Sequence, residues 1–316
     1  MNDKNNIFMK FYAVIEYYDL EKLMRSIDFK LKLANLLPLL ILLILAVWAV
    51  VVPMIPIKAM FLAATMLLCF LALTVFAAES EEELTKKTQN PVASLISVPF
   101  QSNWDFNIGP KEDKSNYLLN IQPVIPISLN QDYNLILRTI LPVKANEYPL
   151  STAGLGDTLQ SFFVGPKAEM NGWIVAAGPV LLYPTATEET LGGRKWAAGP
   201  TGVFLKQHDG WTYGFLGNHL WSYAGNDERR SVNATYLQPF VSYMTKTYTS
   251  LAVNTESTYD WTDSQWTVPI NVMLSQMIKV DDHPVQLLLG YRYYADAPTN
   301  GPDWGIRFQV NFLFPK

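Results

Sequence analysis

The last strand-like segment, Trp304 to Phe314, alternates between two kinds of side chain at every step. One face carries apolar and mostly aromatic side chains: Trp304, Ile306, Phe308, Val310, Phe312 and Phe314. The other face carries Gly305, Arg307, Gln309, Asn311 and Leu313. A period of two predicts a β-strand with two unlike faces. The apolar face suits either the core of a soluble sheet or the lipid side of a membrane barrel, so the rest of the chain must decide.

The same alternation recurs from Val98 onward and predicts eleven further strands before the last one. The connections mostly alternate between long loops, such as Lys144 to Asp157, and tight turns, such as Asn130-Gln131. Long strands joined in this way predict an all-β fold, a 12-stranded antiparallel up-and-down transmembrane β-barrel. The alternative is a soluble β-sandwich with an N-terminal anchor, which would usually have shorter strands.

Several prolines fall inside the predicted strands, although proline cannot donate a hydrogen bond to a neighbouring strand. We expect these prolines to mark bulges in the barrel wall: Pro123, Pro126, Pro179, Pro200, Pro239 and Pro269.

The N-terminal quarter has a different composition, because Leu31 to Ala78 contains only two charged residues. Lys58, the apolar run that follows it and the small residues near Ala77 predict a signal peptide at 54–77, cleaved after Ala77 or Ala78. Cys69 is the only cysteine, so the mature chain would contain none, which suits folding outside the cytoplasm without disulfides.

Two interpretations of segment 1–53 stay open. Either translation starts near Met54, or the segment contributes to a membrane hairpin, since Leu33 to Val52 is long enough to span a bilayer. After the signal peptide, residues 78–96 are polar and predict a periplasmic leader or a short plug helix. The barrel itself is expected at 97–316.

Four runs of sequence carry a resemblance to a known family: Asn90 to Gln101, Leu119 to Ser128, Gly178 to Thr187 and Asn254 to Trp261. In these runs the chain resembles Gram-negative outer-membrane proteins that are usually labelled "transporter" or "neuromedin U". It is similar to the outer-membrane proteins assigned to phenol and toluene degradation pathways. The resemblance covers about 90–316 and implies an outer-membrane barrel with a role in transport, but it implies no particular substrate.

Four charged residues on the polar faces are expected to meet inside the barrel. Asp105 lies near the outer end of the first strand, Arg292 near that of the eleventh and Arg307 near that of the twelfth. Closure makes the twelfth strand a neighbour of both others, and Glu256 lies two strands further on. Opposite charges on adjacent strands can stabilise the wall by pairing, or they can form a constriction that filters ions.

Further polar side chains are predicted to face the lumen: Asn103, Asn120, Gln122, Arg138, Asn254, Gln309 and Asn311. By contrast, the fourth to sixth strands have small, apolar residues on both faces. Their inner faces favour an apolar solute, unless the segment Asn90 to Leu95 packs against them as a plug.

The sequence carries little that points to catalysis. His219 and Ser222 are three residues apart on one strand and therefore point to opposite faces, so they cannot form a nucleophile–base pair within it. No phosphate-binding loop or spaced cluster of metal ligands occurs, and we predict no cofactor and no metal. The chain from Ala78 has 17 basic and 23 acidic residues, a net charge of −6, so nucleic acid is not an expected partner.

The resulting hypothesis is a channel or transporter-like barrel for passive passage of small molecules, with hydrophobic or aromatic compounds as one class of solute, in the outer membrane of a Gram-negative bacterium. Its expected partners are outer-membrane lipid and lipopolysaccharide, the barrel-assembly machinery through the C-terminal strand ending at Phe314, and a small-molecule solute. The alternative is a non-transporting barrel, either structural or a membrane hydrolase that uses His219.

Overall fold

The computed structural model describes residues 81–280 and 283–315, all of which belong to one compact unit, Thr65–Lys316. The expectations for segments 1–53 and 54–77 lie outside the described residues. Within those residues, no helix has the length and apolar character that crossing a membrane would require.

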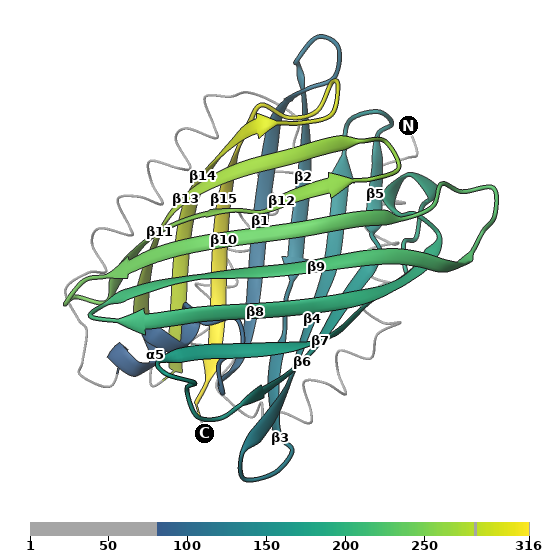
Figure 1. Ribbon diagram of the computed structural model, residues 1–316. Coiled ribbons are helices and arrows are strands. Elements are labelled where there is room, and N and C mark those ends of the chain that lie inside the picture. Colours follow the sequence, from purple (N-terminus) through teal and green to yellow (C-terminus); the bar gives the residue numbers. More distant parts are fainter. Residues whose placement is uncertain (1–80, 281–282, 316) are drawn as a thin grey trace. The chain divides into compact units, whose positions relative to one another are not determined.

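One antiparallel sheet contains every described strand (Figure 1). The chain opens with helix α5 (Glu81–Thr88) and continues through β1 (Ile96–Ile108), β2 (Lys114–Ile121), β3 (Val124–Ser128), β4 (Tyr133–Asn146), β5 (Thr152–Leu155), β6 (Thr158–Pro166), β7 (Trp173–Tyr183), the short 3-10 helix η2 (Glu189–Leu191), β8 (Lys195–His208), β9 (Trp211–Gly225), β10 (Asn233–Met244), β11 (Thr249–Thr255), β12 (Ser257–Asp260), β13 (Gln265–Val280), β14 (His283–Asp296) and β15 (Trp304–Phe314).

The sheet closes on itself, because β9 pairs with β10 and β15 pairs with β1. Three strands of the barrel are each built from two segments, namely β2 with β3, β5 with β6, and β11 with β12. Both members of each pair of segments border the same neighbouring strand. The described strands therefore form a closed 12-stranded antiparallel barrel, which confirms the predicted fold class.

The prediction of one continuous loop from Lys144 to Asp157 is wrong, because strand residues occupy part of this range. β4 continues to Asn146, and β5 pairs with it, with Lys144 opposite Gly154 and Ala145 opposite Ala153. β5 has only four residues and includes a glycine, so its own alternation is too short to indicate a strand. The pairing with β4 supplies the hydrogen bonds that the local pattern does not predict.

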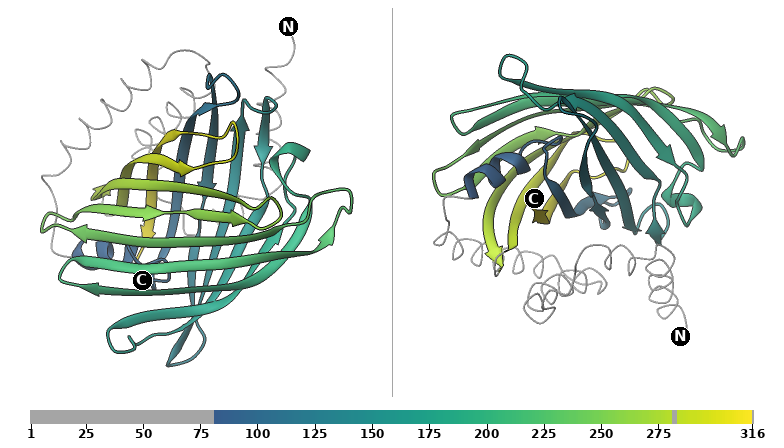
Figure 2. Two further views of the ribbon diagram at one scale, coloured as in Figure 1. Left: turned by 45° about the horizontal axis from the view of Figure 1, so that its top comes forward. Right: turned by 90° about the horizontal axis from the view of Figure 1, so that it is seen from below.

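The tight turns depend on residues that tolerate a left-handed backbone. The turn between β8 and β9 places Asp209 at φ 48° and Gly210 at φ 79°, and the turn before β7 places Asn171 at φ 54° and Gly172 at φ 79°. Positive φ at two successive residues is the geometry of the two-residue turns that match the twist of paired strands. These turns lie at the barrel end that also holds α5 and the C-terminal strand end (Figure 2).

Most of the internal prolines coincide with irregular pairing. Pro123 separates β2 from β3, and the register of β13 with β14 shifts at Pro269. Pro179 on β7 lies opposite Pro200 on β8. The pairing of β7 with β6 and that of β8 with β9 are both interrupted beside these prolines. Pro239 lies where the neighbour of β10 changes from β12 to β11, and the pairing on that side is interrupted between Leu237 and Phe240. Pro126 is the exception, since it lies in regular pairing with β4. The expectation of irregular pairing is thus correct for five of the six prolines.

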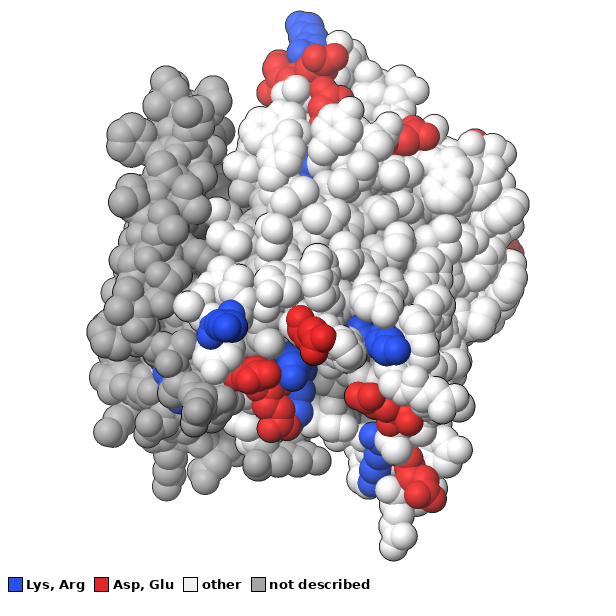
Figure 3. Space-filling view, turned by 60° about the vertical axis from the view of Figure 1, so that its left-hand side comes forward, with Lys and Arg blue, Asp and Glu red and all other residues white. Residues whose placement is uncertain are grey.

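Large apolar side chains cover much of the outside of the barrel. Exposed examples on five different strands are Val164, Phe204, Val241, Leu251 and Val272. In Figure 3 the visible charged side chains gather at the two ends of the barrel and leave a nearly uncharged belt between them. A belt of this kind is what lipid-facing strands require.

Candidate functional site in the barrel lumen

Helix α5 and the segment that follows it occupy one mouth of the barrel, as the end-on view in Figure 2 shows. The helix has acidic residues in its first turn and basic ones in its last, which complements the helix dipole. Two ion pairs along its surface, Glu82 with Lys86 at 3.1 Å and Glu83 with Lys87 at 2.6 Å, support it further. Residues 81–95, called the leader below, therefore have a defined structure inside the barrel end.

Hydrogen bonds join the leader to several strands around the mouth. Gln89 donates to Ser250 Oγ at 2.9 Å and accepts from Thr212 Oγ1 at 2.6 Å. Gln286 donates to Thr88 Oγ1 at 2.9 Å, and Asn134 donates to Ser94 Oγ at 2.7 Å. The leader is thus fastened to β4, β9, β11 and β14, which lie on different sides of the lumen.

The four charged residues expected to meet in the lumen form a chain of contacts in the structure. Arg307 donates two hydrogen bonds to the Glu256 carboxylate, each 2.7 Å long. Arg292 Nε lies 3.3 Å from Asp105 Oδ1, and Arg292 Nη1 lies 3.9 Å from Glu256 Oε2. Arg307 is 1% exposed and Arg292 is 6% exposed, so water does not screen these charges as it would at a surface.

Asn103 joins the two arginines. Its side-chain oxygen accepts one hydrogen bond from Arg292 at 2.6 Å and one from Arg307 at 2.8 Å, and its amide nitrogen donates to the Leu118 carbonyl at 3.2 Å. Sequence reasoning placed Asn103 on the lumen wall but did not identify this bridging role. The only available indication was its position beside Arg307 in a closed barrel.

Strand register explains how these residues come together. Asn103 on β1 lies opposite Arg307 on β15, and Arg292 on β14 lies opposite Gly305 on β15. Glu256 occupies the single-residue break between β11 and β12, next to the register shift at Pro269. Bulges often redirect a side chain beside a functional site, and here the break accompanies the one carboxylate that contacts both arginines.

A cavity of about 500 Å³ lies in the lumen beside this network. Its lining includes eight of the polar residues that were predicted from the sequence to face the lumen: Asn120, Gln122, Arg138, Asn254, Glu256, Arg307, Gln309 and Asn311. Three other predicted residues, Asn103, Asp105 and Arg292, do not line it. Residues of the leader from Lys87 to Leu95 line the cavity as well. The cavity is therefore bordered both by the barrel wall and by the leader.

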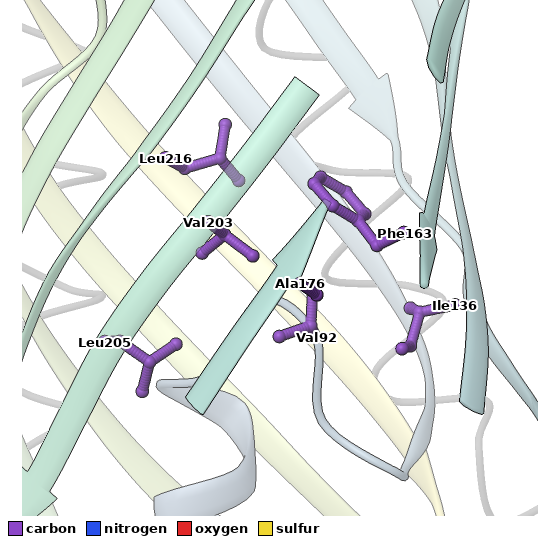
Figure 4. Packing of buried hydrophobic residues seen from close by; sticks show 7 residues of the cluster. All are labelled: Val92, Ile136, Phe163, Ala176, Val203, Leu205 and Leu216. Carbon is purple, nitrogen blue, oxygen red and sulfur yellow. The ribbon is translucent and has the colours of Figure 1, made fainter. Parts of the chain in front are cut away.

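The opposite part of the inner wall is apolar and closely packed. Buried side chains from β4, β6, β7, β8 and β9 point toward one another and toward Val92 of the leader (Figure 4). They are Ile136, Phe163, Ala176, Val203, Leu205 and Leu216. The segment Asn90 to Leu95 was one of two explanations for the small inner residues of the fourth to sixth strands. In the structure Val92 occupies that position, so this apolar region is covered by the chain itself.

His219 lies apart from the lumen cluster, on β9. Its ring nitrogens lie 2.7 Å from Thr235 Oγ1 and 3.0 Å from Asn233 Oδ1, both on β10. Ser222 accepts a hydrogen bond from the Val232 amide and has no contact with His219. Thr235 Oγ1 also accepts a hydrogen bond from the Trp261 indole at 2.8 Å. The neighbours that sequence reasoning missed therefore come from the adjacent strand.

The described residues contain no cluster of three or more histidine, cysteine, aspartate or glutamate side chains that could hold a metal ion.

Comparison with known proteins indicates the fold. No protein-family model matches the chain, and no curated protein matches its sequence. The crystal structure of the COG4313 outer membrane channel from Pseudomonas putida F1 superposes with a TM-score of 0.56 at 16% identity, over 71% of this chain and 96% of that chain. That similarity shows a shared barrel fold. With its closed 12-stranded barrel, this chain is a Gram-negative outer-membrane protein, as predicted.

Two further structures are more distant. The KdgM porin in complex with disordered oligogalacturonate has a TM-score of 0.41 at 10% identity, over 70% of this chain and 99% of that chain. Outer membrane phospholipase A from Escherichia coli has a TM-score of 0.42 at 12% identity, over 73% and 97%. None of the comparisons supports the narrower resemblance to phenol and toluene pathway proteins or to neuromedin U.

Proposed function

We propose that this barrel is a channel for the passive passage of small molecules across the outer membrane. The observation that carries the proposal is the polar cavity of about 500 Å³ inside the lumen. A barrel that served only as a membrane anchor would gain stability by filling this space with packed side chains, since voids forfeit dispersion contacts. The glutamines and asparagines that line the cavity instead favour a wet interior through which a solute can move.

In this proposal the leader restricts passage at the end of the barrel that carries the short turns. Short turns are typical of the periplasmic side, so the leader would lie at the periplasmic mouth. It is held by hydrogen bonds such as that from Gln286 to Thr88 and by the burial of Val92 and Leu95. Such contacts are individually weak, and a solute can pass when they open together.

Conductance in planar lipid bilayers tests the proposal. Protein starting at Ala78 is expected to give discrete conductance steps, and protein shortened to start at Ile96 is expected to give larger and more frequent ones. Both samples should first migrate differently on gels before and after boiling, because a closed barrel resists detergent until it is heated. Folded protein that gives no steps in either form would contradict the channel function.

The charged network permits two roles within this channel. In the first, Asp105, Glu256, Arg292 and Arg307 hold neighbouring strands together and have no influence on ions. In the second, Glu256 and Arg307, which line the cavity, form a charged constriction. Replacing Arg292 and Arg307 by glutamine distinguishes them. A shift of the reversal potential toward cations supports the constriction, whereas unchanged selectivity with lower thermal stability supports the structural role.

The contacts of His219 favour one further candidate, a lipid-facing hydrolase. A hydroxyl, an imidazole and an amide oxygen in sequence are the arrangement used to activate a nucleophile. Here the hydroxyl is that of Thr235 and the amide is that of Asn233. Because Thr235 Oγ1 also accepts a bond from Trp261, we favour a role in fastening β9 to β10. Release of fatty acid from phospholipid that is lost in Thr235→Val would support the hydrolase instead.

The remaining parts of the proposal concern partners. The apolar belt would contact outer-membrane lipid and lipopolysaccharide, and the barrel-assembly machinery would recognise the C-terminal strand that ends at Phe314. Hydrophobic or aromatic compounds are the solutes that the small, apolar inner residues of the fourth to sixth strands suggest. Uptake of such compounds into liposomes that contain the protein tests this narrower part.

A further inference from the structure

We infer that the lumen cavity binds amphipathic organic anions, with Arg138 on β4 as the group that holds the carboxylate. The inference rests on the proposed channel function and names the class of solute for the same lumen.

The first argument is the balance of charge around the cavity. Arg307 is paired with Glu256 at 2.7 Å, and Lys87 is paired with Glu83 at 2.6 Å. Arg138 also lines the cavity, yet it has no carboxylate within 4.0 Å among the described residues. With the neighbouring pair Asp105 and Arg292 included, two lumen carboxylates face three lumen arginines. Arg138 is the lumen arginine without a carboxylate in direct contact, and Glu256 attracts it only over a longer distance.

The second argument is the orientation of the Arg138 guanidinium. Its Nη2 donates to Gln122 Oε1 at 3.0 Å, and Gln122 is itself buried, with 7% exposure. One fixed hydrogen bond holds the group and leaves most of its five N–H donors for another partner. A planar guanidinium matches a carboxylate through two parallel hydrogen bonds, which makes arginine well suited to recognising that group.

The third argument is the unlike character of the cavity walls. Ile140, two residues after Arg138 on β4, lines the cavity, as do Leu159, Leu220 and Phe240. Gln101, Asn120 and Gln309 line it with polar groups. A molecule with an apolar body and one carboxylate can place each part against a matching surface. A cation would be repelled by Arg138, and a neutral molecule would leave the Arg138 charge without a directly contacting partner.

The volume is compatible with such a solute. About 500 Å³ lies within the range of roughly 300–1,000 Å³ that is typical of small-molecule sites. Benzoate, a single ring with one carboxylate, is therefore a suitable probe. Benzyl alcohol and benzylammonium have the same ring with a neutral and a positive group, and acetate has the carboxylate without the ring.

The experiment measures equilibrium binding of these four probes to folded, detergent-purified protein that starts at Ala78. Benzoate is expected to bind at least about tenfold more tightly than benzyl alcohol and benzylammonium, because a hydrogen-bonded charge contributes on the order of one factor of ten or more. Acetate should also bind about tenfold or more weakly, because it lacks the apolar ring that the cavity would bury. Arg138→Gln should weaken benzoate binding by about tenfold or more, and Arg138→Lys should retain part of it. Lys246→Gln removes an exposed charge in the β10–β11 turn and is expected to leave binding unchanged.

Three results would overturn the inference: no benzoate binding, equal binding of benzoate and benzyl alcohol, or binding that survives Arg138→Gln. Boiling-dependent migration of Arg138→Gln on gels confirms that the variant is folded, and Arg138→Lys provides an independent comparison. Conductance recorded on the same samples separates this inference from the proposed function. Binding without conductance contradicts the channel and leaves the anion site in place, whereas conductance without benzoate binding does the reverse.

Discussion

The two sides of the barrel lumen are stabilised in different ways. On β1, β14, β15 and the break between β11 and β12, charged and amide side chains contact one another over distances of 2.6 to 3.9 Å. On β4 and β6 to β9, apolar side chains such as Phe163 and Leu205 are fully buried against Val92 of the leader. One wall thus depends on directional bonds within the barrel, and the other depends on packing against a separate segment.

The two walls therefore have different effects on the space inside the lumen. A packed apolar wall leaves no room for a solute, so the apolar side closes the lumen where the leader covers it. A polar wall can remain hydrated without losing stability, because water can replace many of its contacts. The cavity accordingly lies where side chains such as Gln101 and Asn254 line the lumen.

The largest effect is expected in the apolar wall. Phe163→Ala should destabilise the barrel by about 3–5 kcal/mol, because it removes a fully buried aromatic side chain and leaves a cavity. Phe162→Ala is the matched control, since it lies one residue earlier and points to the other face of β6. We expect a much smaller loss there. Unfolding by urea in detergent micelles measures both values, and similar losses would contradict the described packing.

The charged wall should respond nearly as strongly. Glu256→Gln leaves Arg307, which is 1% exposed, without its ionic partner, and breaking a buried ion pair costs about 3 kcal/mol or more. The control is Glu189→Gln, whose carboxylate pairs with Arg194 at 3.3 Å on the exposed η2. Exposed pairs contribute only about 0–1 kcal/mol. Equal changes in unfolding free energy in the two variants would show that the lumen pair is hydrated.

The sequence predicted most of the fold for a simple reason. Alternation with a period of two depends only on which face meets lipid, and it persists over strands as long as β15 and β13. β5 was missed because four residues carry too little of that pattern. Strand order followed from closure, so the proximity of Asp105, Arg292 and Arg307 could also be expected.

The exact partners in the lumen could not be predicted in the same way. They depend on the break at Glu256 and the register shift at Pro269, and a bulge changes which side chain lies opposite another without leaving a clear mark in the alternation. The contacts of Val92 could not be predicted either, because the sequence of a short leader does not indicate which strands the leader packs against. Both features arise from tertiary structure rather than from the local pattern.

A smaller effect is expected where β8 bends beside β9. A Cβ added at Gly199 would lie 1.7 Å from the His219 carbonyl oxygen, whereas at Gly202 the nearest atom would be 3.9 Å away. Gly199→Ala should therefore destabilise the barrel by about 1–3 kcal/mol, as overpacking does. Gly202→Ala, three residues along the same strand, should be neutral or slightly stabilising. If Gly199→Ala left the stability of the barrel unchanged, β8 and β9 would be able to move apart at this point without a cost in free energy.

The smallest effect concerns the contact between the leader and the apolar wall. Val92→Thr keeps the shape of the side chain but places a hydroxyl among apolar neighbours, at a cost of about 1–3 kcal/mol. The leader should then leave the wall more often, while the barrel itself stays folded.

Two measurements detect this release. Trypsin cleavage after Lys86 or Lys87 should become faster in Val92→Thr, and conductance should switch more often between low and high levels. Ser94→Ala changes an exposed position in the same segment and removes only its bond from Asn134, so we expect a weaker response. If neither measurement distinguishes Val92→Thr from Ser94→Ala, packing against the apolar wall does not hold the leader, and its hydrogen bonds to β4, β9, β11 and β14 are sufficient.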